Sequence, residues 1–183
     1  MTAELTLTAD RRFEFAYGKT LPEKEEWMAT EYFPAAGPSF MKYGCERLAG
    51  FGIMATNVRD VSPVQGAFTS WPTAKHRADL LVDPGFAPLL PVRDAAMDHL
   101  SDGHLFQPID EVIALNTDSD YAIVLSADAN AAGEPIVSLP LADDSPDQTY
   151  AGKSISILPW GDRAEALLGG APENAEVFRV RFG

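Results

Sequence analysis

The chain has 183 residues, 46% of them hydrophobic, which is enough for one well-packed core and a small appended lobe. Its formal net charge of −13 argues against nucleic acid and anionic membranes as partners, because both are bound through basic patches. The single cysteine, Cys45, excludes an intrachain disulfide, and the lack of a long apolar run or of a signal-peptide core predicts a cytoplasmic protein.

The first predicted strand lies near the N-terminus. Residues 12–19 alternate between apolar and polar positions, with Phe13, Phe15 and Tyr17 on one face, as in a half-buried strand. Residues 1–10 before it are expected to be a loose arm or an extra edge strand.

A helix is predicted to follow this strand. Thr20 and Glu23 form a capping-box pattern, which marks a helix start. Trp27 and Tyr32 belong to a broad apolar face of this helix, two prolines interrupt its second half, and Gly44 is expected to end it.

Two strands and a second helix come next. Residues 46–58 and 65–71 are predicted to be strands, and residues 72–100 a long helix that bends at its internal prolines. Ser101-Asp102-Gly103 is expected to end that helix, and a further strand begins at Leu105.

The order through residue 109 is therefore β-α-β-β-α-β, the split βαβ arrangement of ferredoxin-like α+β domains, which we assign to residues 11–110. Four antiparallel strands with both helices on one face leave the opposite sheet face open. A second copy of the chain is the simplest cover, so we expect a homodimer through this face.

Residues 111–183 are expected to form a β-rich C-terminal extension with one short helix. Its predicted strands are 111–115, 121–126, 136–141, 155–158 and 177–182, and its helix is 162–168. No sequence repeat connects the two parts of the chain, although a degraded second βαβ half stays open as an alternative.

The strand order is joined by a set of short motifs in the second helix region. These are Trp71-Pro72, Ala78-Asp79, Asp83-Pro84-x-Phe86 and Pro91-x-Arg93. Together they resemble the dimeric α+β barrel superfamily, and most closely its small domains of unknown activity related to antibiotic-biosynthesis-type monooxygenases.

The resemblance covers residues 11–110 and implies both an architecture and a class of chemistry. In this superfamily two sheets pack face to face in a homodimer, and a ligand lies between each sheet and its own helices. Its members include cofactor-independent monooxygenases, muconolactone isomerases and haem-degrading enzymes, besides many proteins without a known activity.

Arg93 is the one charged residue on the predicted apolar face of the second helix. It has three interpretations: it reaches out to water, it pairs with a buried carboxylate, or it faces a cavity that receives an anion. The neighbouring Asp94 points away from it on a helix, so Glu14 and Glu31 are the expected partners.

The histidines do not predict a metal site. His99 and His104 are five residues apart with a Ser-Asp-Gly break between them, whereas two ligands on one helix face are usually four apart. A helix end stabilised by a histidine explains this pair without any function. A place for His99 in a substrate pocket is the alternative.

Three aromatic side chains are candidate ligand-binding residues. Tyr17, Trp27 and Trp71 each combine an apolar ring with one polar atom, as small-molecule sites require, although each is also explained by ordinary core packing.

Two classes of function follow. The first is a cofactor-independent monooxygenase or isomerase that acts on a small aromatic or acidic molecule, in which Arg93 holds an anionic or enolate oxygen and His99 helps to shape the site. The second is a non-catalytic small-molecule binding or scaffold protein. The chain has no glycine-rich phosphate loop and no Gly-x-Ser-x-Gly elbow, and no cofactor is expected.

Overall fold

An eight-stranded antiparallel sheet is the frame of the molecule. The structure is a computed structural model that describes residues 2–183. The strands follow the spatial order β5-β2-β4-β3-β10-β7-β9-β8. Their bounds are β2 (Arg12–Thr20), β3 (Glu46–Thr56), β4 (Gln65–Trp71), β5 (Met97–Phe106), β7 (Tyr121–Ser126), β8 (Val137–Pro140), β9 (Ser154–Pro159) and β10 (Ala175–Phe182).

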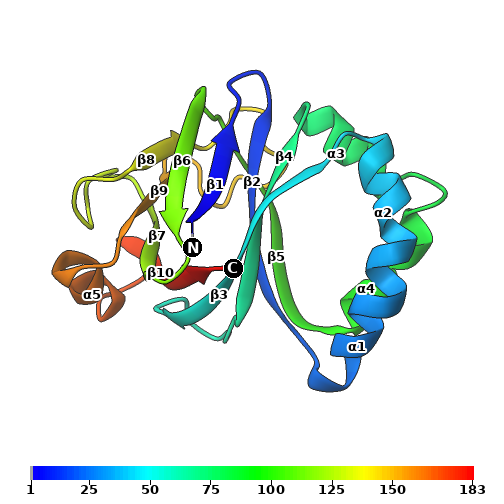
Figure 1. The fold of residues 1–183 in the computed structure, drawn as a ribbon, viewed down its shortest axis with the longest axis horizontal. Helices are drawn as coiled ribbons and strands as arrows, with labels where there is room; N and C mark the ends of the chain where they lie inside the picture. Colours follow the sequence, from blue (N-terminus) through cyan, green and yellow to red (C-terminus); the bar gives the residue numbers. More distant parts are fainter. Residues whose placement is uncertain (1) are drawn as a thin grey trace.

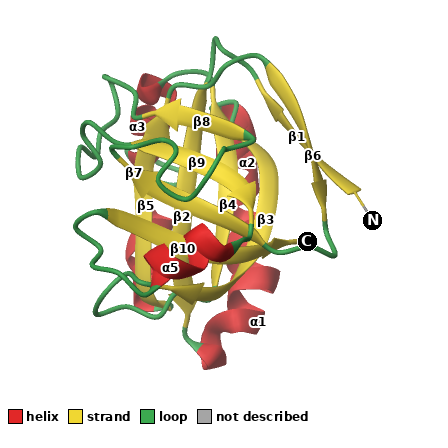
Figure 2. Cartoon of the chain, turned by 90° about the vertical axis from the view of Figure 1, so that its left-hand side faces the viewer, coloured by secondary structure: helices red, strands yellow, loops and turns green. Residues whose placement is uncertain are grey.

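The two outer strands of this sheet meet, so the sheet curls into a barrel (Figure 2). Phe106 at the end of β5 forms a bridge with Leu141, just beyond β8. The N–H of Ala142 donates to the carbonyl of Leu105 at 2.9 Å, and the N–H of Gln107 donates to the carbonyl of Pro140 at 2.9 Å. Closure leaves neither outer strand as a free edge at this point.

The barrel consists of two sets of four strands with the same arrangement. When the strands of each set are numbered along the chain, β5-β2-β4-β3 and β10-β7-β9-β8 both have the ferredoxin-like order 4-1-3-2. The second set keeps only one helix, α5 (Asp162–Leu168), which lies between β9 and β10 in the chain. The topology therefore shows a reduced second half, although the sequence shows no repeat.

The face of the first half that was expected to be open is covered by the second half of the same chain. Phe15 and Phe178 lie with ring centroids 5.3 Å apart, and Phe13, Ile123 and Ile157 belong to the same buried cluster. Each such side chain contributes about 1.5–3 kcal/mol when it leaves water. A second copy is not needed to cover this face, so the expected homodimer through it is wrong.

The helices of the first half form a layer on the outer face of β2, β3, β4 and β5 (Figure 1). They are η1 (Pro22–Lys24), α1 (Glu25–Trp27), η2 (Met28–Tyr32), α2 (Phe33–Lys42), α3 (Ala74–Leu81), η3 (Ala87–Leu89) and α4 (Leu90–Ala95). No helix within residues 2–183 is long and apolar enough to cross a membrane.

The first helical segment starts differently from the prediction. Thr20 does not cap it: its hydroxyl lies 3.5 Å from the sulfur of Met97 and accepts a hydrogen bond from the amide of Gln65 at 3.2 Å. The helix nevertheless continues to Lys42. Pro34 lies at the start of α2, where a missing N–H costs little, and Pro38 lies inside α2 without ending it.

The second helical segment is shorter than predicted. It ends at Ala95, and residues 97–100 belong to β5, where Leu100 pairs with Gly18 and His99 with Lys19. A short run of apolar residues fits a helix or a strand equally well, and here the pairing with β2 decides. His99 and His104 therefore lie on a strand and not at a helix end.

The Asp83-Pro84 motif has a structural role. The carboxylate of Asp83 accepts hydrogen bonds from the N–H of Gly85 at 2.8 Å and the hydroxyl of Tyr43 at 2.9 Å, and it pairs with Lys42. The Lys42 ammonium, followed by these two donors, lowers the pKa of Asp83 to about 2. Asp83 thereby ties the turn after α3 to the end of α2.

The N-terminal residues form a strand. β1 (Thr2–Leu7) pairs with β6 (Glu111–Asn116) in a separate two-stranded sheet beside the barrel (Figure 2). Leu5 and Leu7 are buried in the same cluster as the barrel core. The strand interpretation of residues 1–10 is thus confirmed for residues 2–7.

Because one chain supplies the whole barrel core, we expect the midpoint of urea unfolding to be independent of protein concentration. A midpoint that rises over a hundredfold increase in concentration would mean that a second subunit contributes to the core.

A second prediction concerns His104, which is 3% exposed inside the barrel, with its Nε2 2.7 Å from the hydroxyl of Ser101. Burial lowers the pKa of His104 below its usual 6.5, against the opposing charge of Asp147. The unfolded chain then binds a proton that the folded chain does not, so the free energy of unfolding is highest above pH 6.5 and falls as the pH decreases.

Urea unfolding at pH 5, 6 and 7 measures this dependence. His104→Phe should reduce the change of the unfolding free energy with pH. His76→Ala, at an exposed position, should leave this change unaltered. An unchanged slope in His104→Phe would show that another group carries it.

Candidate functional site

A cavity of about 1100 Å³ lies between the sheet of the first half and its helical layer. The strands that form its floor place large side chains in the barrel and small ones toward the helices. Small residues of these strands that line the cavity include Ala16, Gly18, Gly50, Gly52 and Ala67. A Cβ at Gly52 would have no other atom within 4 Å, which shows how open this part of the floor is.

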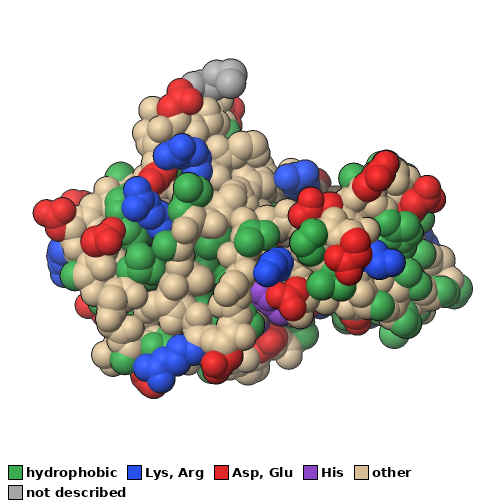
Figure 3. Space-filling model, turned by 90° about the horizontal axis from the view of Figure 1, so that it is seen from below, with side chains coloured by type: hydrophobic (Ala, Val, Ile, Leu, Met, Phe, Trp, Pro, Cys, Tyr) green, Lys and Arg blue, Asp and Glu red, His purple; other side chains and the backbone are tan. Residues whose placement is uncertain are grey.

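Apolar side chains surround the entrance of the cavity. Phe33, Met41 and Val64 line it and are 55%, 74% and 48% exposed. Figure 3 shows hydrophobic side chains gathered on the surface of the helical layer, at the right of the view. An entrance of this kind suits an apolar ligand.

Glu14 is the central polar group of the cavity wall. It is 5% exposed and accepts four hydrogen bonds. The donors are the N–H of Gly103 at 2.9 Å, the hydroxyl of Thr69 at 3.0 Å, the indole N–H of Trp71 at 2.5 Å and Nε of Arg77 at 2.7 Å. Donors from two strands, β4 and β5, and from α3 therefore converge on this carboxylate of β2.

The ion pairs continue from Glu14 along the cavity. Arg77 forms an ion pair with one oxygen of Asp102 at 3.4 Å. Arg93 forms an ion pair with the other oxygen of Asp102, also at 3.4 Å, and a second one with Asp94 at 2.8 Å. Burial acts to lower the pKa of Arg93, but the two carboxylates outweigh it and raise the pKa, so the guanidinium stays charged.

Of the three interpretations of Arg93, the structure supports both pairing and a place in the cavity. Its partners differ from the expected ones, because Glu14 pairs with Arg77 and Glu31 is exposed. Asp94, which was expected to point away, pairs with Arg93, because the long arginine side chain folds back along the helix surface.

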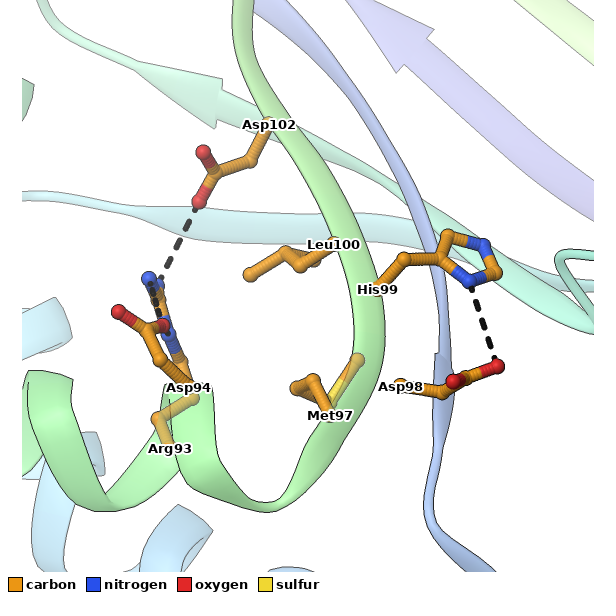
Figure 4. Close-up of a pocket in the computed structure, with 7 residues that line it drawn as sticks. All are labelled: Arg93, Asp94, Met97, Asp98, His99, Leu100 and Asp102. Carbon is orange, nitrogen blue, oxygen red and sulfur yellow. Dashed lines mark hydrogen bonds and ion pairs between the residues drawn. The ribbon is translucent and has the colours of Figure 1, made fainter. Parts of the chain in front are cut away.

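His99 lies on the other side of β5 from Arg93 (Figure 4). A small pocket of about 300 Å³ borders both residues, but the His99 ring turns toward Asp98, whose carboxylate is 3.8 Å from its Nδ1. Nε2 of His99 is buried without a hydrogen-bond partner. The structure does not bring His99 into the large cavity.

The three predicted aromatic residues have different environments. Trp71 lines the cavity, and its indole N–H is bound to Glu14. Tyr17 borders the floor, but its ring packs in the barrel core with its centroid 4.8 Å from that of Phe178. Trp27 is half-buried outside the cavity lining, next to Tyr32.

Arg77 is a site residue that was not predicted from the sequence. It is only 7% exposed, although Lys75 and His76 beside it are exposed. The available signal was its spacing of three and four residues from Leu80 and Leu81, which places it on their helix face.

Tyr32 and Cys45 line the cavity as neutral groups. Burial raises the pKa of the Tyr32 phenol, although the charge of Arg93 acts in the opposite direction. Burial raises the pKa of the Cys45 thiol to about 12, so it is not an activated nucleophile. Within residues 2–183 there is no cluster of three or more histidine, cysteine or carboxylate side chains that could hold a metal ion.

Comparisons with known proteins show the fold. No family model and no curated protein sequence matches the chain. A solved structure of an anthrone oxidase-like protein matches with a TM-score of 0.54 and 12% identity, over 94% of this chain and 91% of that one.

Two further solved structures match less closely. A putative monooxygenase from Fusobacterium nucleatum subsp. nucleatum ATCC 25586 has a TM-score of 0.45 at 10% identity, over 95% of this chain and 93% of that one. A putative monooxygenase from Lactobacillus acidophilus NCFM has 0.40 at 8%, over 94% of both chains. The match to the anthrone oxidase-like protein shows a shared fold, and the expected α+β fold class is confirmed.

The buried pair between Glu14 and Arg77 generates a stability prediction. Glu14→Ala leaves Arg77 buried without its main partner, which should lower the free energy of unfolding by about 3–5 kcal/mol in urea titrations. Glu134→Ala, at an exposed position, is the control and should change it by less than about 0.5 kcal/mol. If both variants changed the free energy of unfolding equally, the buried pair of Glu14 and Arg77 would not be important for stability.

Proposed function

We propose that the chain is a cofactor-independent enzyme of the monooxygenase or isomerase kind, which acts on a small aromatic or acidic molecule in the large cavity. The observation that carries the proposal is the row of ion pairs along one wall of an open and mostly apolar cavity. A non-catalytic binding or scaffold protein would be favoured by a closed, wholly apolar cavity, which this is not.

Arg93 and Tyr32 are the groups proposed to stabilise negative charge on the substrate. The guanidinium has five N–H donors, of which three donate to Asp94 and Asp102 and one interacts with the Tyr32 hydroxyl, so one donor is left for a ligand. The neutral Tyr32 phenol adds an O–H donor beside it. A fixed charge and a neutral donor in a site shielded from water stabilise an enolate as it forms.

Of the other predicted site residues, Trp71 is proposed to contact the ligand and His99 is not. Trp71 keeps its proposed place at the ligand, because it lines the cavity. His99 is on the far side of β5 from Arg93, so we propose no proton transfer between His99 and a ligand in the large cavity.

The test uses anthrone, a planar tricyclic ketone that forms an enol, with oxygen as the second reactant and anthraquinone and water as products. Oxygen uptake above the uncatalysed rate supports the proposal. Arg93→Ala should lower kcat/KM by about 10²- to 10³-fold, the usual effect of losing one donor to an oxyanion.

Arg163→Ala is the matched control, because Arg163 is an exposed arginine of α5, far in the fold from the helical layer. Circular dichroism checks that both variants fold. If Arg93→Ala oxidises anthrone as fast as the unmodified protein does, the role given to Arg93 is wrong. No oxidation by the folded unmodified protein would favour the binding or scaffold alternative.

A further inference from the structure

Arg47 is an arginine of the cavity that no carboxylate neutralises. It belongs to β3 and lines the cavity, but it has no ion pair or hydrogen bond among the described residues. Arg77 and Arg93, the other two arginines of the first half that line the cavity, are each paired with carboxylates.

A glycine keeps the Arg47 guanidinium close to the floor. A Cβ added at Gly50 would lie 2.2 Å from one terminal nitrogen of Arg47, 3.3 Å from its Cζ and 3.7 Å from its Nε, so the end of the guanidinium points onto this glycine. Gly50 is buried although Arg47 is exposed, which means that the arginine covers the floor and presents its free donors at the cavity.

The strand register places Arg47 in line with the charged wall. Arg47 pairs with Thr69 across β3 and β4, and Thr69 pairs with Glu14 across β4 and β2. Arg47 and Glu14 are thus two strands apart, at about 10 Å. The Glu14 carboxylate already accepts four hydrogen bonds, so it does not compensate the charge of Arg47.

An uncompensated cation is significant in a chain with a net charge of −13, which repels anions at long range. We propose that Arg47 is a specificity-determining residue that binds an anionic group, such as a carboxylate, on a planar ligand whose rings lie over the glycine floor. The inference rests on the proposed function, because that function places the ligand in this cavity. It adds that the substrate is an acid. The charged group of this acid would lie at β3, about three strands from β5, where Asp102 pairs with Arg93.

The test compares two probes of the same shape, anthraquinone-2-carboxylate and its methyl ester, by titration calorimetry. The unmodified protein should bind the carboxylate about tenfold or more tightly than the ester, as expected for a hydrogen-bonded ion pair. Arg47→Ala should bring this ratio close to one.

Gly50→Ala is the second variant, because it keeps the charge and displaces the guanidinium from the floor. It should lower the ratio in the same direction as Arg47→Ala. Arg163→Ala, which removes an equally exposed and unpaired arginine from α5, should leave the ratio unchanged. Circular dichroism confirms the fold of each variant.

The outcomes separate this inference from the proposed function. Equal binding of both probes by the unmodified protein, or a ratio that Arg47→Ala does not change, overturns the role of Arg47, whatever the result with anthrone. A ratio that depends on Arg47 in a protein that does not oxidise anthrone supports the anion site and contradicts the oxidation. Failure of both probes to bind overturns the inference.

Discussion

The hydrogen-bonded ion pair between Glu14 and Arg77 is the interaction on which the arrangement of the cavity depends. Glu14 comes from the first strand of the sheet and Arg77 from a helix of the layer above, and both are almost fully buried. A buried charge is tolerated only when it is paired and hydrogen-bonded, and the donors from Thr69, Trp71 and Gly103 meet that requirement. The pair therefore holds the sheet and the helices in register along one wall of the cavity, while small residues keep the rest of the floor free.

Because one chain closes the barrel by itself, its two halves have different structural roles. The second half supplies the apolar face that packs against Phe13 and Phe15. It keeps one helix, and a small cluster that includes Val124, Val177 and Ala164 fills the space beneath it. The first half keeps its full helical layer and contains the large cavity. The ion pairs of Glu14, Arg77, Asp102 and Arg93 therefore all lie in the first half.

Charge compensation distinguishes the arginines of the cavity. Arg77 and Arg93 share Asp102, so the charge of this wall is largely neutralised before any ligand binds. A neutralised wall favours a ligand that develops charge during reaction over one that is already charged. Arg47 lies outside this network, and the difference between the two environments is the basis for proposing separate places for a reacting oxygen and for a permanent anion.

The sequence by itself determined the strands near residues 12–19, 46–58 and 65–71 and the β-α-β-β-α-β order of the first half. Alternation and helix-breaking residues act over a few positions, so local pattern was sufficient there. Arg93 was found for the same reason, as a charge on an apolar stripe. The tertiary structure decided what sequence spacing does not encode: that β10 joins β3 and closes the barrel, that residues 97–100 pair with Gly18 and Lys19 as a strand, and that Glu14 selects Arg77. Each depends on contacts between residues far apart in the chain, and these contacts determine which face is covered and which charge stays free.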